Sequence, residues 1–179
     1  MHRLTLLAVL LAPAPAAADI YLEEPPPPPV EHGYLGGGFA LSVDHFFNAT
    51  LGIEGGWKLG DLPLWVRGDA ERGGTGDFEG TGPFRRGRLG LETRTGGPGL
   101  CAVGSFEAGY QTQVWAATDE TTEHHHGAIV TGRVGLDAGG SHLRFRLALE
   151  ISRYHHVSDV LPTEWAGGAG LSMGLVYRL

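Results

Sequence analysis

From residue 34 onward the chain repeats one pattern, in which apolar side chains occupy every second position between interruptions by glycine, proline, aspartate or asparagine. Side chains along a β-strand point alternately to opposite faces, so this pattern predicts strands with one apolar and one polar face. Eight such runs follow one another: 34–44, 49–59, 64–71, 84–95, 100–115, 128–138, 142–152 and 165–179. The sequence therefore predicts an all-β chain of eight strands.

The segments between the runs alternate in length. Short turns follow the second, fourth and sixth runs, whereas segments of about twelve residues follow the third, fifth and seventh, at 72–83, 116–127 and 153–164. Only the first connection, 45–48, breaks the rule. Short turns at one end and longer loops at the other are typical of membrane-spanning barrels, and an even strand number places both termini at the short-turn end.

Alternation alone does not say which face is inside, because a soluble lipocalin-type barrel points its apolar face inward and a membrane barrel points it outward. The polar face here has mixed sign, which suits mutual neutralisation in a narrow lumen. Its acidic members are Glu54, Asp69, Glu71, Glu92, Glu107, Asp137 and Glu150, and its basic members are Lys58, Arg67, Arg86, Arg88, Arg94, Arg133, Arg144, Arg146 and Arg178. Arginine, which pairs carboxylates in a bidentate manner, replaces lysine almost throughout. We therefore predict an eight-stranded antiparallel up-and-down transmembrane β-barrel over residues 33–179.

Two segments precede the barrel. Residues 1–18 have a basic start, a short apolar stretch and three alanines before Asp19, which is the pattern of a cleaved signal peptide. Residues 19–32 contain five consecutive prolines, which favour an extended polyproline II rod, and we interpret them as a proline-rich periplasmic segment. The formal net charge is −7, and loss of Arg3 with residues 1–18 makes it more negative. This charge argues against nucleic acid as a partner.

The last eight residues, SMGLVYRL, resemble the C-terminal assembly signal of bacterial outer-membrane β-barrel proteins. Ser172, Gly174, Tyr177 and Leu179 fill its four fixed places, with leucine in place of the commoner final phenylalanine. The resemblance implies that these four residues are read by the barrel assembly machinery. It also implies that the last strand pairs with the first, since an unpaired strand edge in lipid is costly.

Residues 33–179 as a whole resemble the small OmpA/OmpX-type barrels. The resemblance implies a location in the outer membrane of a Gram-negative bacterium, in contact with outer-membrane lipid and lipopolysaccharide. A barrel of eight strands is just wide enough for its own side chains, so we expect no large pore. The expected role is structural or a surface interaction.

Histidines gather at the predicted loop end of the barrel. Six of the nine histidines fall in its predicted loops: His45, His124, His125, His126, His155 and His156. Imidazoles from separate loops can bind zinc, nickel or copper. Adjacent histidines in an acidic loop usually point in different directions, however, so we predict no metal site and no cofactor.

One histidine also belongs to a second pattern, because His156 and Ser158 share one face of an extended chain. This His-x-Ser spacing resembles that of the outer-membrane lipid A deacylases, which are also small barrels. The resemblance implies His156 as base, Ser158 as nucleophile and Glu164 as the acid that orients the imidazole.

The strand phase of the His-x-Ser pair separates the two hypotheses. Counting from Leu149 and Ile151 turns His156 and Ser158 inward, unless a bulge at 153–155 changes the phase. A deacylase needs Ser158 to reach lipid from the outer wall. A serine ester hydrolase acting on lipid A is therefore the alternative to the structural role.

Overall fold

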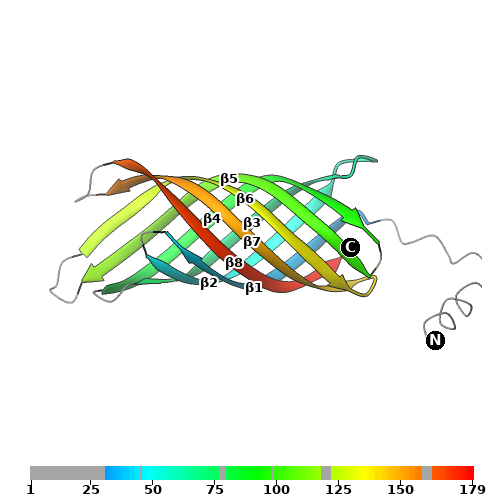
Figure 1. Ribbon diagram of the computed structural model, residues 1–179, viewed down its shortest axis with the longest axis horizontal. Helices are drawn as coiled ribbons and strands as arrows, with labels where there is room; N and C mark the ends of the chain where they lie inside the picture. Colours follow the sequence, from blue (N-terminus) through cyan, green and yellow to red (C-terminus); the bar gives the residue numbers. More distant parts are fainter. Residues whose placement is uncertain (1–30, 45, 77–79, 98, 118–121, 159–162) are drawn as a thin grey trace, which may run out of the picture.

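The computed structural model is a closed barrel of eight strands (Figure 1). It describes residues 31–44, 46–76, 80–97, 99–117, 122–158 and 163–179, so the predicted signal peptide, the proline run and His45 lie outside the described residues. The strands are β1 (Gly33–Val43), β2 (Phe47–Lys58), β3 (Leu64–Gly76), β4 (Gly80–Gly96), β5 (Leu100–Ala117), β6 (Thr122–Gly139), β7 (Leu143–Ser158) and β8 (Glu164–Arg178). In the part of the chain that the structure describes, no helix is long and apolar enough to cross a bilayer.

Each strand pairs antiparallel with the next one along the chain, and β8 returns to pair with β1. The closing ladder runs from Tyr34 opposite Arg178 to Val43 opposite Ala169. Closure leaves no free sheet edge, so backbone donors and acceptors of the wall are satisfied within the ladder. The predicted eight-stranded antiparallel up-and-down barrel is confirmed.

The barrel has two unlike ends. The terminal end carries both ends of the barrel chain and the short turns β2–β3, β4–β5 and β6–β7, and the loop end carries the other four connections (Figure 1). The terminal-end turns use glycines with positive φ: Gly60 at 56°, Gly96 at 133° and Gly139 at 148°. Glycine adopts these angles without the steric cost that a Cβ imposes.

The strands are longer at the loop end than the alternation predicts, so the predicted long loops 72–83, 116–127 and 153–164 are wrong. The strand β3 continues to Gly76 and β4 begins at Gly80, while β5 and β6 are separated only by 118–121 and β7 and β8 only by 159–163. The predicted first connection, 45–48, is also shorter, because β2 begins at Phe47. An apolar outward position is demanded only where the wall faces hydrocarbon, whereas the hydrogen-bond ladder can continue into water without it.

The closing seam between β1 and β8 is packed backbone against backbone. Gly38 and Gly174 face each other across it. A Cβ added to Gly174 would lie 2.6 Å from the carbonyl oxygen of Gly37 and 3.0 Å from the Cα of Gly38. The seam therefore closes only because a side chain is absent there.

We expect Gly174→Val to lower the stability of the closed barrel by about 1–3 kcal/mol, because the added carbons meet backbone atoms that cannot move aside. The matched control is Gly132→Val, since a Cβ at Gly132 meets no atom within 4 Å. The measurement is urea unfolding of the refolded protein in vesicles, read from the folded band on an unheated denaturing gel. Equal midpoints for the two variants would contradict this account of the seam.

Candidate functional site

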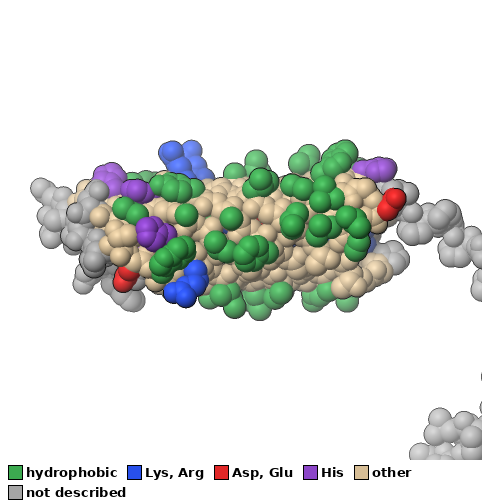
Figure 2. All heavy atoms as spheres, turned by 90° about the horizontal axis from the view of Figure 1, so that it is seen from above, with side chains coloured by type: hydrophobic (Ala, Val, Ile, Leu, Met, Phe, Trp, Pro, Cys, Tyr) green, Lys and Arg blue, Asp and Glu red, His purple; other side chains and the backbone are tan. Residues whose placement is uncertain are grey.

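The barrel wall is inverted relative to that of a water-soluble protein (Figure 2). Large apolar side chains stand on the outside, with Leu51 70 %, Ile53 71 % and Ile151 73 % exposed. The charged side chains of the same strands lie inside, and Arg67 and Glu92 are almost completely buried. A contiguous apolar surface of this extent marks a surface that contacts hydrocarbon rather than water. The predicted exchange of faces is confirmed.

Aromatic side chains frame this apolar surface toward both ends. Trp57 and Tyr177 point outward near the terminal end, and Tyr110 and Trp165 point outward nearer the loop end. The hydroxyl of Tyr110 shares a hydrogen bond of 2.6 Å with Nδ1 of His126. Rings with one apolar and one polar side favour the boundary between hydrocarbon and water, so these residues form the girdles that membrane barrels carry.

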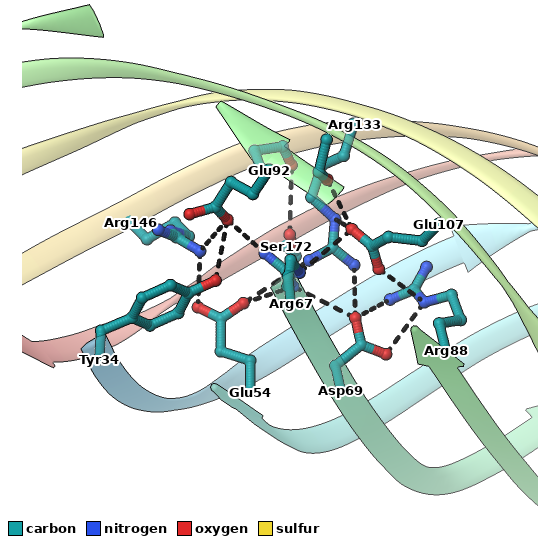
Figure 3. A network of polar contacts seen from close by, with 12 residues as sticks. Tyr34, Glu54, Arg67, Asp69, Arg88, Glu92, Glu107, Arg133, Arg146 and Ser172 are labelled. Carbon is teal, nitrogen blue, oxygen red and sulfur yellow. Dashed lines mark hydrogen bonds and ion pairs between the residues drawn. The ribbon is translucent and has the colours of Figure 1, made fainter. Parts of the chain in front are cut away.

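The lumen is filled by an ionic network with Arg67 at its centre (Figure 3). The guanidinium of Arg67 contacts carboxylates from four strands: Glu54 at 2.5 Å, Asp69 at 3.2 Å, Glu92 at 3.1 Å and Glu107 at 3.1 Å. Arg67 and these acids come from β2, β3, β4 and β5. One side chain thus ties half of the wall together from inside.

A second arginine extends the network toward the loop end. Arg88 contacts Asp69 at 3.0 Å, Glu71 at 2.5 Å and Glu150 at 2.6 Å, which links β3 and β4 to β7. Arg133 of β6 shares Asp69 and Glu150 with it, at 3.2 and 3.5 Å. Asp69 and Glu150 therefore each neutralise more than one guanidinium.

The network also extends toward the terminal end. Arg146 donates two hydrogen bonds to Asp137, at 2.7 and 2.9 Å, and a further one of 3.1 Å to Glu92. The hydroxyl of Tyr34 donates to Glu92 at 2.9 Å, and the guanidinium of Arg94 lies 4.1 Å from the centroid of the Tyr34 ring. These contacts span the barrel from β1 to β7.

The network seals the middle of the barrel. Removing charges from water is costly unless each one finds partners, and here the opposite signs lie within ion-pair distance of each other. A cavity of about 40 Å³ lies beside β1, with Glu54, Arg67 and Ser172 among its lining residues. That volume holds only a few water molecules, so it is no channel for solutes.

The lumen near the loop end has a different chemistry. The buried polar side chains in this part are mostly neutral: Asn48, Thr50, Thr75, Gln111 and Gln113. Two histidines, His125 and His156, are buried beside them. Nδ1 of His125 and Nε2 of His156 are hydrogen-bonded, and the carboxylate of Glu123 lies 3.1 Å from Nε2 of His125. The rings of Phe46 and His125 pack in a T-shaped arrangement with centroids 5.3 Å apart.

The predicted placement of five histidines in loops is wrong, because His124–His126 lie in β6 and His155 and His156 in β7. Strand alternation sends His125 and His156 inward and their neighbours outward. In the described residues, no group of three or more histidine, cysteine, aspartate or glutamate side chains is arranged to hold a metal ion.

The residues of the predicted hydrolase site lie near one another at the loop-end mouth of the lumen. Ser158 lies opposite His125 in the β6–β7 register, and Glu164 lies opposite His156 in the β7–β8 register. The β7–β8 register is unbroken from 143 to 156, so no bulge changes the strand phase. Ser158 therefore shares the lumen-facing side of β7 with His156. The catalytic roles implied by the resemblance stay a prediction.

Comparison with known proteins gives a fold and no family. No protein-family model matches the chain, and none of the curated proteins matches it. Among solved structures, Neisserial surface protein A superposes with a TM-score of 0.63 at 6 % identity, covering 83 % of this chain and 96 % of that one.

Two further solved structures are similar. Ail, the attachment invasion locus protein of Yersinia pestis, has a TM-score of 0.56 at 13 % identity, covering 84 % of this chain and all of that one. The N-terminal β-barrel domain of Pseudomonas aeruginosa OprF has a TM-score of 0.52 at 16 % identity, covering 80 and 98 % of the two chains. The chain thus has the fold of the small eight-stranded outer-membrane barrels.

Glu92 forms ion pairs with the buried guanidiniums of Arg67, Arg94 and Arg146. We therefore expect Glu92→Gln to destabilise the barrel by about 3 kcal/mol, because these three groups lose a shared negative charge. The control is Asp61→Asn in the exposed β2–β3 turn, for which we expect a change within about 0.5 kcal/mol. Urea unfolding in vesicles, followed by tryptophan fluorescence, gives both values. A Glu92→Gln midpoint equal to that of Asp61→Asn would show that the network is not an energetic unit.

Proposed function

We propose that the protein is a structural or surface-interaction barrel of the bacterial outer membrane, with a sealed lumen and no large pore. The observation that carries this proposal is the pairing of an apolar outer wall with an ionic lumen, since neither surface is stable in the other's place. The fold that it shares with outer-membrane barrels supports the same conclusion. A passive core leaves the wall and the loop end as the surfaces that act.

The proposal includes export and orientation. Residues 1–18 supply the features of a signal peptide, and residues 19–32 then form a proline-rich periplasmic segment. The terminal end, with its short turns, faces the periplasm, and the loop end faces outward, as in other barrels of this kind. Outer-membrane lipid and lipopolysaccharide are the partners proposed for the wall.

Recognition by the barrel assembly machinery is proposed for Ser172, Gly174, Tyr177 and Leu179. Before β8 pairs with β1, one of its edges is free. Tyr177 on its outward face and Leu179 directly after it are both about half exposed in the finished barrel. Ser172 and Gly174 lie on its other face, toward the lumen. The motif thus offers an apolar edge to a partner and a small, uncharged inner face.

We expect Tyr177→Ser with Leu179→Ser to abolish assembly in a Gram-negative host, because the edge loses the apolar groups proposed for recognition. Leu143→Ser with Phe145→Ser is the matched control. Leu143 pairs with Tyr177, so this double substitution removes a similar apolar area from the same end of the wall. Fractionation of the full chain reports the folded outer-membrane form. Assembly lost equally in both double variants would assign the effect to the wall rather than to the signal.

The sealed lumen predicts no stepwise pore conductance in planar bilayers. Porin-sized conductance steps would overturn the sealed lumen.

The lumen-facing phase of Ser158 predicts that refolded wild-type protein and Ser158→Ala release no ester-linked acyl chains from lipid A beyond a protein-free control. Acyl release by wild type but not by Ser158→Ala would replace the structural role with the hydrolase.

A further inference from the structure

The outer wall of the barrel carries positive charge without any negative charge to balance it. In the described residues of the eight strands, every aspartate and glutamate occupies a lumen-facing position. Three arginines nevertheless point outward and are exposed: Arg72, Arg85 and Arg153. The protein as a whole is acidic, with a formal charge of −7, so this wall differs in sign from the molecule that bears it.

Two of these arginines are neighbours. Arg72 of β3 and Arg85 of β4 lie directly opposite each other in the antiparallel register. Like charges directly opposite on one face of a sheet are unfavourable unless an anion lies between them. Among the described residues, the wall provides no carboxylate for this purpose, so an anion from outside the protein can supply the counter-charge.

The surface around the pair is shallow and open. The outward-facing neighbours of Arg72 and Arg85 along their strands are Ala70, Gly74, Pro83 and Gly87. A Cβ added at Gly74 would meet no atom closer than 3.8 Å, and one at Gly87 none closer than 3.9 Å. Small residues thus flank both arginines along their own strands, which leaves room for a bulky anionic group to approach.

The arginines also lie at one particular level of the wall. Counted from the terminal end, the outward positions of β3 are Leu64, Val66, Gly68 and Ala70 before Arg72 is reached. Those of β4 are Thr95, Thr93, Leu91, Leu89 and Gly87 before Arg85. Figure 2 shows the outward basic side chains toward the loop end of the apolar surface. This is the level of lipid headgroups, which long basic side chains reach by extending from the hydrocarbon boundary.

We propose that Arg72 and Arg85 form a binding site on the β3–β4 wall for the phosphate groups of a phosphorylated glycolipid headgroup in the outer leaflet. This inference rests on the proposed outer-membrane location. Guanidinium groups bind phosphate through paired, charge-assisted hydrogen bonds, and two adjacent ones hold a headgroup more specifically than a single one does. Arg153, the single outward-facing arginine of β7, provides a weaker contact.

The affinity-tagged protein is refolded in mixed micelles with a zwitterionic lipid and a chelator of divalent cations. The test measures how much diphosphoryl lipid A the captured protein retains. The chelator excludes cation bridges between phosphates and carboxylates. We expect Arg72→Gln with Arg85→Gln to weaken retention by about tenfold, and Arg153→Gln to weaken it by about twofold at most. Lipid A without phosphates is the ligand control, and free inorganic phosphate is added as a competitor.

Retention that is equal in wild type and the Arg72→Gln, Arg85→Gln variant, or equal for lipid A with and without phosphates, would overturn the inference. Displacement of lipid A by millimolar inorganic phosphate would also overturn it, because the site would then recognise the free ion. A folded-band assay in vesicles that lack lipid A is run on every variant. Failure of wild type to insert there would refute the proposed function itself, separately from the arginine site.

Discussion

The structure depends on the mutual neutralisation of charges that a closed, narrow barrel forces together. Once β8 pairs with β1, each inward side chain lies in a lumen with little room for water, and the charged residues neutralise one another there. Arg67 and Arg88 satisfy this constraint through carboxylates from several strands at once. These ion pairs then hold the strands together, because lipid supplies no hydrophobic driving force between them.

The same constraint divides the molecule into a passive and an interactive part. The ionic network fills the middle of the lumen, so chemistry with outside molecules is left to the wall and to the loop end. The wall contributes an apolar surface with an arginine pair at Arg72 and Arg85, and the loop end contributes a mouth lined by neutral polar groups and the His125–His156 pair. A stable core with functional surfaces is what the proposed structural or surface-interaction role requires.

The fold was predictable because lipid and lumen impose opposite demands on alternate residues. The run around Leu147 and Leu149 shows both demands plainly, because its apolar residues alternate with polar ones. The charged residues between them are of both signs, which favours placing them in the lumen. Strand ends at the loop end were not predictable, since beyond Ile151 the outward residues no longer need to be apolar while the ladder continues to Ser158. The contact between His125 and His156 depends on the β6–β7 register, which alternation alone does not fix.

The central claim is that the apolar face contacts hydrocarbon while the polar face is enclosed. Trp57 and Trp65 test it directly, because they lie on adjacent strands, one position apart in the β2–β3 register, with Trp57 exposed outside and Trp65 buried inside. The measurement is fluorescence quenching by brominated lipid in two variants that each retain only one of these tryptophans. The account predicts strong quenching of Trp57 and little of Trp65. Quenching of Trp65 with protection of Trp57 would mean that the two faces are exchanged, and would contradict it.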